Sequence, residues 1–438
     1  MAMTTYNENM VWPTAPEVLE ESPHANSIWQ EATAWLVLLP TMFITVSGRI
    51  QTDSGPVAFR FTAMEEDSLA RKLTRLGCSL LIVILLSGHI REILAVCKRS
   101  KLLLLLPLLA FVSALWSQNP QHSLVDALNL LLTTLFAIYL YLRYPGERLV
   151  SFLTFAAFVS LLLCVCTVVL FPSVGIDAYQ QDAWRGIFGQ RNNCATACTL
   201  FLVVGLHAPA RGIIERMIRA SVIFLSVVFV VMSGSRTGWL LTGLALVLTF
   251  GLRFINRIRS LDRILFLMVA AVPSLLIALW VGTHFNEVLA ALDKDPTMTQ
   301  RTVIWAQVIP SILKHPLLGY GYSSFWMGLS GESMQTVLTT GWMEGQAQDG
   351  YLEILLQLGL VGLIPLCVLF LRGFKDSVAA VEGGLLNRGL PLAIVLLPLI
   401  LVGNIGESSL LFPLGIPWFY ALTAILTLSL SRRPAEDF

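Results

Sequence analysis

Four arginines carry the side chains most suited to chemistry in this sequence: Arg185 and Arg191 in one segment between apolar stretches, Arg236 in a turn, and Arg301 in a second, longer segment. A guanidinium offers a rigid fork of donors that matches a phosphate group and stays charged at physiological pH. The alternative for each is contact with lipid headgroups, or pairing with an acid such as Glu332 or Glu344. Function is favoured for Arg236, because a charge at the junction of two apolar segments is costly unless it is paired or faces water.

The elements that position these arginines are predicted to be membrane-spanning helices. The chain has 438 residues, 55% hydrophobic and 13% charged, against roughly a quarter charged in a typical soluble domain. Apolar segments of about 20 residues predict about twelve spans, near residues 30–48, 76–96, 101–116, 122–142, 149–171, 193–209, 217–233, 237–253, 263–283, 350–371, 389–405 and 411–430. We therefore expect an all-α integral membrane protein, with a disordered cytoplasmic tail at 1–27 and a single polytopic domain at 28–433.

The connecting segments predict the orientation of these spans. With the N-terminus inside, the even-numbered turns hold most lysines and arginines, as cytoplasmic loops do. The first outer segment, around 49–75, is an exception, since it carries both basic and acidic residues. We expect both termini in the cytoplasm and the four arginines on the outer face.

Two outer segments, 172–192 and 284–349, are longer than tight turns, and long loops in compact proteins are usually functional or disordered. Apolar residues at helical spacing from Val303 to Ile312 predict an amphipathic helix, which Pro316, Gly319 and Gly321 then end. We expect these two segments to form the active-site region. The sequence contains no P-loop, no dinucleotide-binding turn and no basic stripe for nucleic acid.

Several motifs resemble those of the O-antigen ligase/polymerase family (Wzy/WaaL-like), most closely its ExoQ-type exopolysaccharide polymerases. The likeness runs from about residue 112 to 370, in the segments Ser113–Pro120, Trp184–Asn192, Ser233–Gly238, Arg301–Gly321 and Asp349–Gly362. The resemblance implies a GT-C-like polytopic glycosyltransferase of the bacterial inner membrane, with its active site on the periplasmic face. Its donor would be an undecaprenyl-pyrophosphate-linked oligosaccharide, used without nucleotide sugars, cofactors or a metal ion.

The resemblance also implies roles for individual residues. Arg185, Arg236 and Arg301 would hold the pyrophosphate leaving group, and Arg191 would assist. Further substrate contacts are expected from Asn192, Trp305, His315, Glu344, Tyr351 and Glu353. A chain-length regulator and a flippase of the same pathway are the expected protein partners, alongside membrane lipids.

One departure from the family pattern concerns the general base. Many members carry histidine and asparagine where this chain has Gln348 and Asp349. Asp349 is our first candidate for the base, since partial burial raises a carboxyl pKa, although it is equally suited to cap the following helix. Glu344 and His315 are the alternatives.

The sequence therefore predicts a membrane glycosyltransferase that polymerises lipid-linked repeat units into O-antigen or exopolysaccharide. An O-antigen ligase, which transfers finished glycan to lipid A core, is the nearest alternative. A transporter or flippase of a lipid-linked anion is the alternative from another class, because it would also need arginines that face a cavity.

Overall fold

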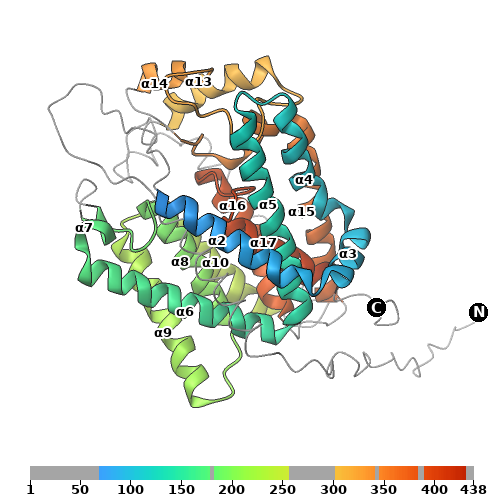
Figure 1. The fold of residues 1–438 in the computed structure, drawn as a ribbon. Coiled ribbons are helices and arrows are strands. Elements are labelled where there is room, and N and C mark those ends of the chain that lie inside the picture. Colours follow the sequence, from blue (N-terminus) through green and yellow to red (C-terminus); the bar gives the residue numbers. More distant parts are fainter. Residues whose placement is uncertain (1–68, 178–181, 256–300, 341–344, 383–388, 431–438) are drawn as a thin grey trace, which may run out of the picture.

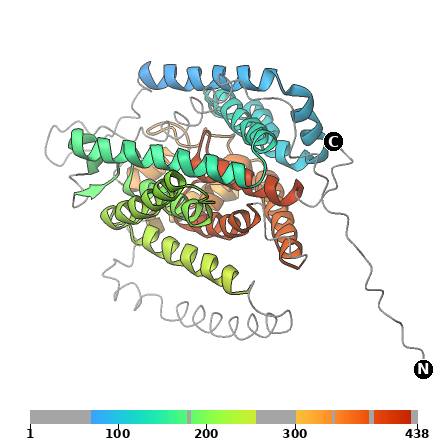
Figure 2. The same ribbon diagram turned by 90° about the horizontal axis from the view of Figure 1, so that it is seen from below.

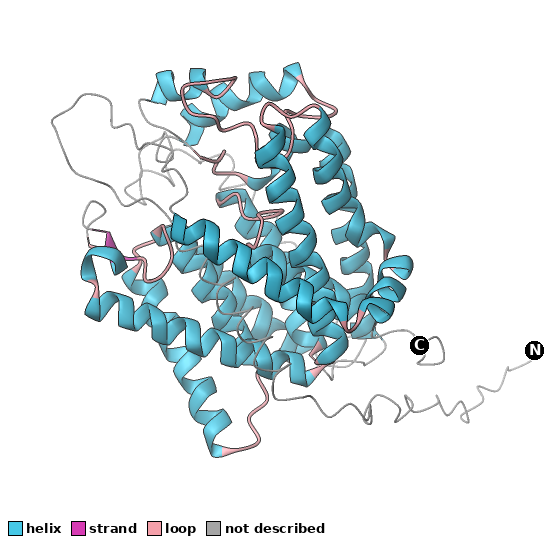
Figure 3. Ribbon diagram, in the orientation of Figure 1, coloured by secondary structure: helices cyan, strands magenta, loops and turns pink. Residues whose placement is uncertain are grey.

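The structure is a computed structural model that describes residues 69–177, 182–255, 301–340, 345–382 and 389–430. Helices make up nearly all of it (Figure 3). The elements are α2 (Leu69–Ser87), α3 (Ile90–Arg99), α4 (Lys101–Val112), η2 (Ser113–Leu115), α5 (Pro120–Arg143), α6 (Glu147–Leu170), α7 (Pro172–Gly175), β1 (Ile176–Asp177), β2 (Ala183–Trp184), α8 (Arg191–His207), α9 (Ile213–Met232), α10 (Arg236–Ile255), α13 (Arg301–Lys314), α14 (Met334–Thr340), α15 (Gly350–Glu382), α16 (Leu390–Gly406) and α17 (Ile416–Leu430). The two short strands pair antiparallel.

The described helices make the chain a multi-pass all-α membrane protein, as predicted. Four of them, α5, α6, α10 and α15, are long and apolar enough to cross a membrane, or five spans if α2 and α3 count as one. Helices α4, α16 and α17 are apolar but shorter. The count of about twelve spans stays a prediction, and the spans expected at 30–48 and 263–283 lie outside the described residues.

Two predicted spans differ from the structure. The segment 76–96 is not one straight helix, because the chain bends by 94° between α2 and α3. The break falls at Gly88 and His89, and α3 ends in Lys98 and Arg99, which favour a position at the membrane surface. Helix α4 has 12 residues, fewer than the roughly 20 that a span needs.

The helices are layered around α8, which lies inside the bundle. Most residues of α8 from Cys194 to Gly205 are buried, and it packs against α6, α9, α10 and α16. Figure 2 shows α2 (blue) and α10 (yellow-green) on opposite sides of the molecule, while α13 and α14 lie across one end (Figure 1). The predicted outer helix is thus found as α13, with Ile304, Val308 and Ile312 buried against the rest.

The segment that follows α13 completes a break in α15. Gly359, with φ 60° and ψ −157°, interrupts that helix. Backbone groups left open by the break bond to the segment instead: Tyr320 N donates to Leu356 O at 2.8 Å, and Leu360 N donates to Pro316 O at 2.9 Å. This pairing, which we call the backbone latch, fixes α13 and its outer segment on the membrane helices, because it satisfies backbone groups that the break would otherwise leave open.

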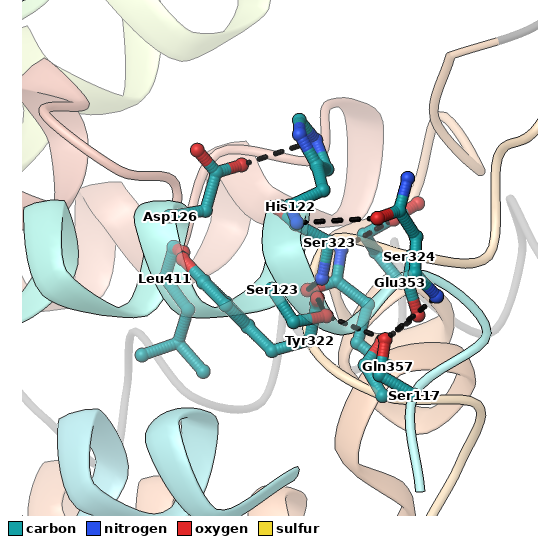
Figure 4. A network of polar contacts seen from close by, with 12 residues as sticks. Ser117, His122, Ser123, Asp126, Tyr322, Ser323, Ser324, Glu353, Gln357 and Leu411 are labelled. Atoms are coloured by element: carbon teal, nitrogen blue, oxygen red, sulfur yellow. Dashed lines mark hydrogen bonds and ion pairs between the residues drawn. The ribbon is translucent and has the colours of Figure 1, made fainter. Parts of the chain in front are cut away.

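A buried polar network holds the other side of the outer segment. The Ser123 hydroxyl on α5 donates to Tyr322 O at 2.6 Å, and Tyr322 N donates to the Ser113 hydroxyl at 2.9 Å. Figure 4 shows Ser117 and Ser123 beside Tyr322, and Gln357 between Ser323 and Glu353. The outer segment is therefore bonded to α5 and to α15 at once.

The latch predicts that Gly359→Ala destabilises the protein. The new Cβ would lie 2.3 Å from the Leu317 carbonyl carbon, at a backbone φ of +60°, which together should cost at least about 2 kcal/mol. Thermal unfolding of the purified protein in detergent measures this as a lower melting temperature. Gly243→Ala is the matched control, because a Cβ at that position would have nothing within 4 Å among the described residues. Equal melting temperatures for the two variants would contradict the latch.

Candidate active site

Two of the predicted arginines are each the first residue of a helix, Arg191 of α8 and Arg236 of α10, and Arg301 is the first described residue of α13. A helix N-terminus carries partial positive charge, so a cation placed there is unfavourable unless an anion lies nearby. The same geometry makes helix N-termini good binding sites for phosphate groups. These helix starts therefore combine two sources of positive potential.

The starts of α8 and α10 are held together by the turn before Arg236. The Ser235 hydroxyl donates to Asn192 Oδ1 at 2.8 Å. Gly234 takes a positive φ of 59°, which turns the chain from α9 into α10. A Cβ at Gly238 would lie 2.3 Å from the Ala195 Cβ, so only glycine allows the two helices to approach this closely. The motif Ser233–Gly238 thus brings the start of α10 against the start of α8.

A carboxylate that the sequence analysis missed joins these helices to α13. Glu407, directly after α16, is 2% exposed. Its Oε1 accepts hydrogen bonds from Arg301 Nη2 at 3.0 Å and from Asn192 Nδ2 at 2.8 Å. Glu407 stands in a short polar turn between two apolar segments, which is the signal that singled out Arg236. The same signal, applied to acidic residues as well as basic ones, finds it.

The turn that presents Glu407 is fixed by Asn404. Its Oδ1 accepts from Ser409 N at 3.1 Å and from Leu410 N at 3.0 Å, which folds the chain back over the end of α16. Gly406 lets this end come close to α10, since a Cβ there would lie 2.9 Å from Thr237 Cγ2. Asn404 and Gly406 therefore fix the turn that carries Glu407, and the carboxylate itself is bonded to Arg301 and Asn192.

Burial and charge act in opposite directions on Glu407. Desolvation raises the pKa of its carboxyl group above the ordinary value, while the charge of Arg301 and the bonds from Asn192 and Arg301 lower it. Oε2 is buried and has no hydrogen-bond partner among the described residues. The Glu407 carboxylate is thus bonded to Arg301 through one oxygen only, and its other oxygen stays unbonded among the described residues.

Asp349 lies at the start of α15, near the same arginine. Its Oδ1 accepts from Tyr351 N and from Leu352 N, both at 2.9 Å, so it caps the helix. Burial raises the pKa of the Asp349 carboxyl, whereas these two hydrogen bonds and the positive charge of Arg301 lower it. Asp349 therefore has both of the properties that the sequence suggested for it: it caps a helix, and its carboxyl group has a raised pKa.

The other predicted residues are placed around this cluster or away from it. Trp305 Nε1 donates to Ala347 O at 3.0 Å, and the Tyr351 hydroxyl donates to Leu401 O at 2.9 Å. Arg185 donates from Nε to Val174 O at 2.8 Å and from Nη2 to Ser173 O at 3.2 Å, both within its own loop.

One predicted carboxylate and one histidine do not join the cluster. Glu353 is taken up by Trp326 Nε1 at 3.0 Å, Ala347 N at 2.7 Å and Gln357 Nε2 at 2.6 Å. His315 follows the far end of α13, so the 14-residue helix separates it from Arg301 by about 20 Å. Glu344 lies outside the described residues.

The fold and this cluster define a multi-pass membrane protein with an arginine–carboxylate site where several helices begin. Residues 221–367 match the family model described as O-Antigen ligase. Over 147 residues the chain is 31% identical to the exopolysaccharide production protein ExoQ of Rhizobium meliloti (strain 1021). The aligned region covers 32% of this chain and 34% of that protein. The resemblance to the O-antigen ligase/polymerase family is thus confirmed over a region that contains Arg236, Arg301 and Asp349.

The buried pair predicts that Arg301→Ala lowers stability. The paired side chains are 14% and 2% exposed, and removing one partner of a buried ion pair costs about 3–5 kcal/mol. Because burial favours protonated Glu407, the stability of this variant should rise as pH falls from about 8 to about 5. Thermal unfolding at both pH values measures the effect. A double variant with Glu407→Gln should recover much of the loss, and a melting temperature for Arg301→Ala equal to wild type would contradict the pairing.

Proposed function

We propose that the protein is a membrane glycosyltransferase that joins undecaprenyl-pyrophosphate-linked oligosaccharide units into a polysaccharide. The observation that carries this proposal is the meeting of the starts of α8 and α10 with Arg301 of α13 at Glu407. Arg191 and Arg236 stand at those two helix starts, and together with Arg301 they supply positive charge for a diphosphate. The likeness to the O-antigen ligase family model and to ExoQ supports a lipid-linked glycan as the substrate.

The proposed reaction is a single displacement at the anomeric carbon of the lipid-linked sugar. An acceptor hydroxyl attacks this carbon and forms the new glycosidic bond, while the bond from the carbon to the pyrophosphate oxygen breaks. The hydroxyl proton passes to Asp349, and lipid pyrophosphate leaves with the bonding electrons. Negative charge grows on the departing oxygen, where fixed arginines and helix N-termini lower the barrier.

The remaining residues are assigned from their contacts. Asn192 positions Arg301 through Glu407, and Arg185 shapes the loop that leads into α8. Trp305 and Tyr351, which are half-buried near the start of α15, are the proposed sugar contacts, as aromatic rings stack on sugar rings. Glu353 supports the segment before α15. We place this site on the periplasmic face of the bacterial inner membrane, with both termini in the cytoplasm.

A ligase is the second candidate, because the family description that matches residues 221–367 is O-Antigen ligase. A ligase and a polymerase share the donor and the leaving group, and they differ in the acceptor. Lipid A core would take the place of a second lipid-linked glycan. The arginine site serves both reactions equally.

A ladder assay tests the proposed function. Purified protein in nanodiscs is mixed with undecaprenyl-pyrophosphate-linked repeat units in the presence of a chelator, and the products are separated on a gel. We expect a ladder of polymers, and a loss of rate of about 10²–10³ in Arg236→Ala and Arg301→Lys. Lysine keeps the charge at 301 but cannot match the phosphate with two donors. Intact substrate with wild-type protein would exclude the polymerase, and lipid A core as acceptor would then test the ligase.

The variant Asp349→Asn distinguishes the proposed role of Asp349 as general base from its role as helix cap. Asparagine caps a helix as well as aspartate does, so the melting temperature should stay unchanged. The transfer rate should fall by about 10²–10⁴, because an amide cannot take the proton. Asp349→Ala should lose both activity and about 1 kcal/mol of stability. Full activity in Asp349→Asn would leave Asp349 as a cap only.

A further inference from the structure

We infer that Glu407 is a resident anion of the arginine site, which competes with the substrate diphosphate for Arg301 and so promotes release of the spent lipid pyrophosphate. The inference rests on the proposed function. It assigns a role in affinity and turnover to a residue that no part of the family resemblance points to.

The geometry places the carboxylate where a diphosphate oxygen would bind. Arg301 Nη2 donates to Glu407 Oε1 at 3.0 Å, and Asn192 Nδ2 donates to the same oxygen at 2.8 Å. Such N–H donors form the same kind of bond with phosphate oxygens. In the structure, Arg301 is therefore already bound to an anion, and a diphosphate must compete with that anion for the guanidinium.

Orientation of Arg301 does not require a charged residue. A glutamine at 407 has an oxygen of the same reach, and it accepts bonds from Arg301 and Asn192 as the carboxylate does. What glutamate adds is a negative charge inside a site that is 2% exposed at this residue. That charge repels a bound diphosphate, and burial strengthens the repulsion.

The unpaired oxygen of Glu407 indicates that the carboxylate is not there for stability. Oε2 is buried and lacks a hydrogen-bond partner within the described part of the chain. Leaving a buried acceptor unbonded is destabilising, and a residue that served only to join α16 to α13 would have both oxygens bonded. The unbonded oxygen of Glu407 thus lowers the stability of the fold, and the negative charge of the same carboxylate repels a bound diphosphate.

Release of the product gives this opposition a use. After each transfer, lipid pyrophosphate remains on Arg301 and on the arginines at two helix starts, and it must leave before the next donor enters. A carboxylate that returns to Arg301 replaces the bonds that the departing diphosphate gives up. The site can then bind the transition state strongly without retaining the product.

The affinity of the full-length protein in nanodiscs for inorganic pyrophosphate tests the inference, because the inference predicts that removing the Glu407 charge raises this affinity. We expect Glu407→Gln to bind at least about tenfold more tightly than wild type, from the loss of one charge within several ångströms. In the ladder assay, kcat should fall while KM does not rise. Glu407→Met, which is uncharged and accepts neither bond, should also bind more tightly. Glu332→Gln is the control, since this carboxylate pairs with Lys314 at 2.8 Å on the outer segment, and its affinity should stay at the wild-type value.

The opposite results separate the two claims. Weaker binding in Glu407→Gln would mean that the charge holds Arg301 in place, and equal binding would mean that a diphosphate does not sense it; either overturns the inference alone. If pyrophosphate binds wild type and Arg301→Lys weakens it, the proposed site stands regardless of the result at 407. No binding by wild type and by Glu407→Gln would overturn both.

Discussion

The pairing of Arg301 with Glu407 is the interaction on which the packing of α8, α13 and α16 against one another depends. It joins α13 to the end of α16, and Asn192 adds the start of α8 through the same carboxylate oxygen. A buried ion pair gives little net stability, but losing one partner is costly. Separating α8, α13 and α16 would therefore be costly. The pair also puts charge where uncharged side chains would pack with a lower desolvation cost.

The outer segment is built to serve that constraint. Arg301 begins α13, and the position of α13 is set by the backbone latch at Gly359 and by the network around Tyr322. The break in α15 is thus a means of binding the segment after α13 to a long apolar helix through backbone hydrogen bonds. Side chains at the surface of the segment remain available to a substrate.

The sequence predicted the class of fold well, because apolar length and basic turns are direct consequences of the membrane. It also located α13 and the arginines, whose charge conflicts with their apolar surroundings. His89 and Arg91 interrupt the apolar segment 76–96, and the segment 101–116 is short for a span, so the sequence marks both as weak spans. It could not predict the 94° bend itself, since an apolar segment looks alike whether it crosses the membrane straight or not. Its polar turn between two apolar segments marks Glu407 as a candidate, but the pairing of Glu407 with Arg301, 106 positions away, follows from no local pattern.

The most direct test of the arginine site is an experimental structure of the protein in a nanodisc with undecaprenyl pyrophosphate bound. We predict that the diphosphate lies within about 3 Å of the Arg301 guanidinium, beside the starts of α8 and α10, with the bond from Arg301 to Glu407 broken or lengthened. A diphosphate bound at another place, with Arg301 and Glu407 still paired, would contradict this prediction.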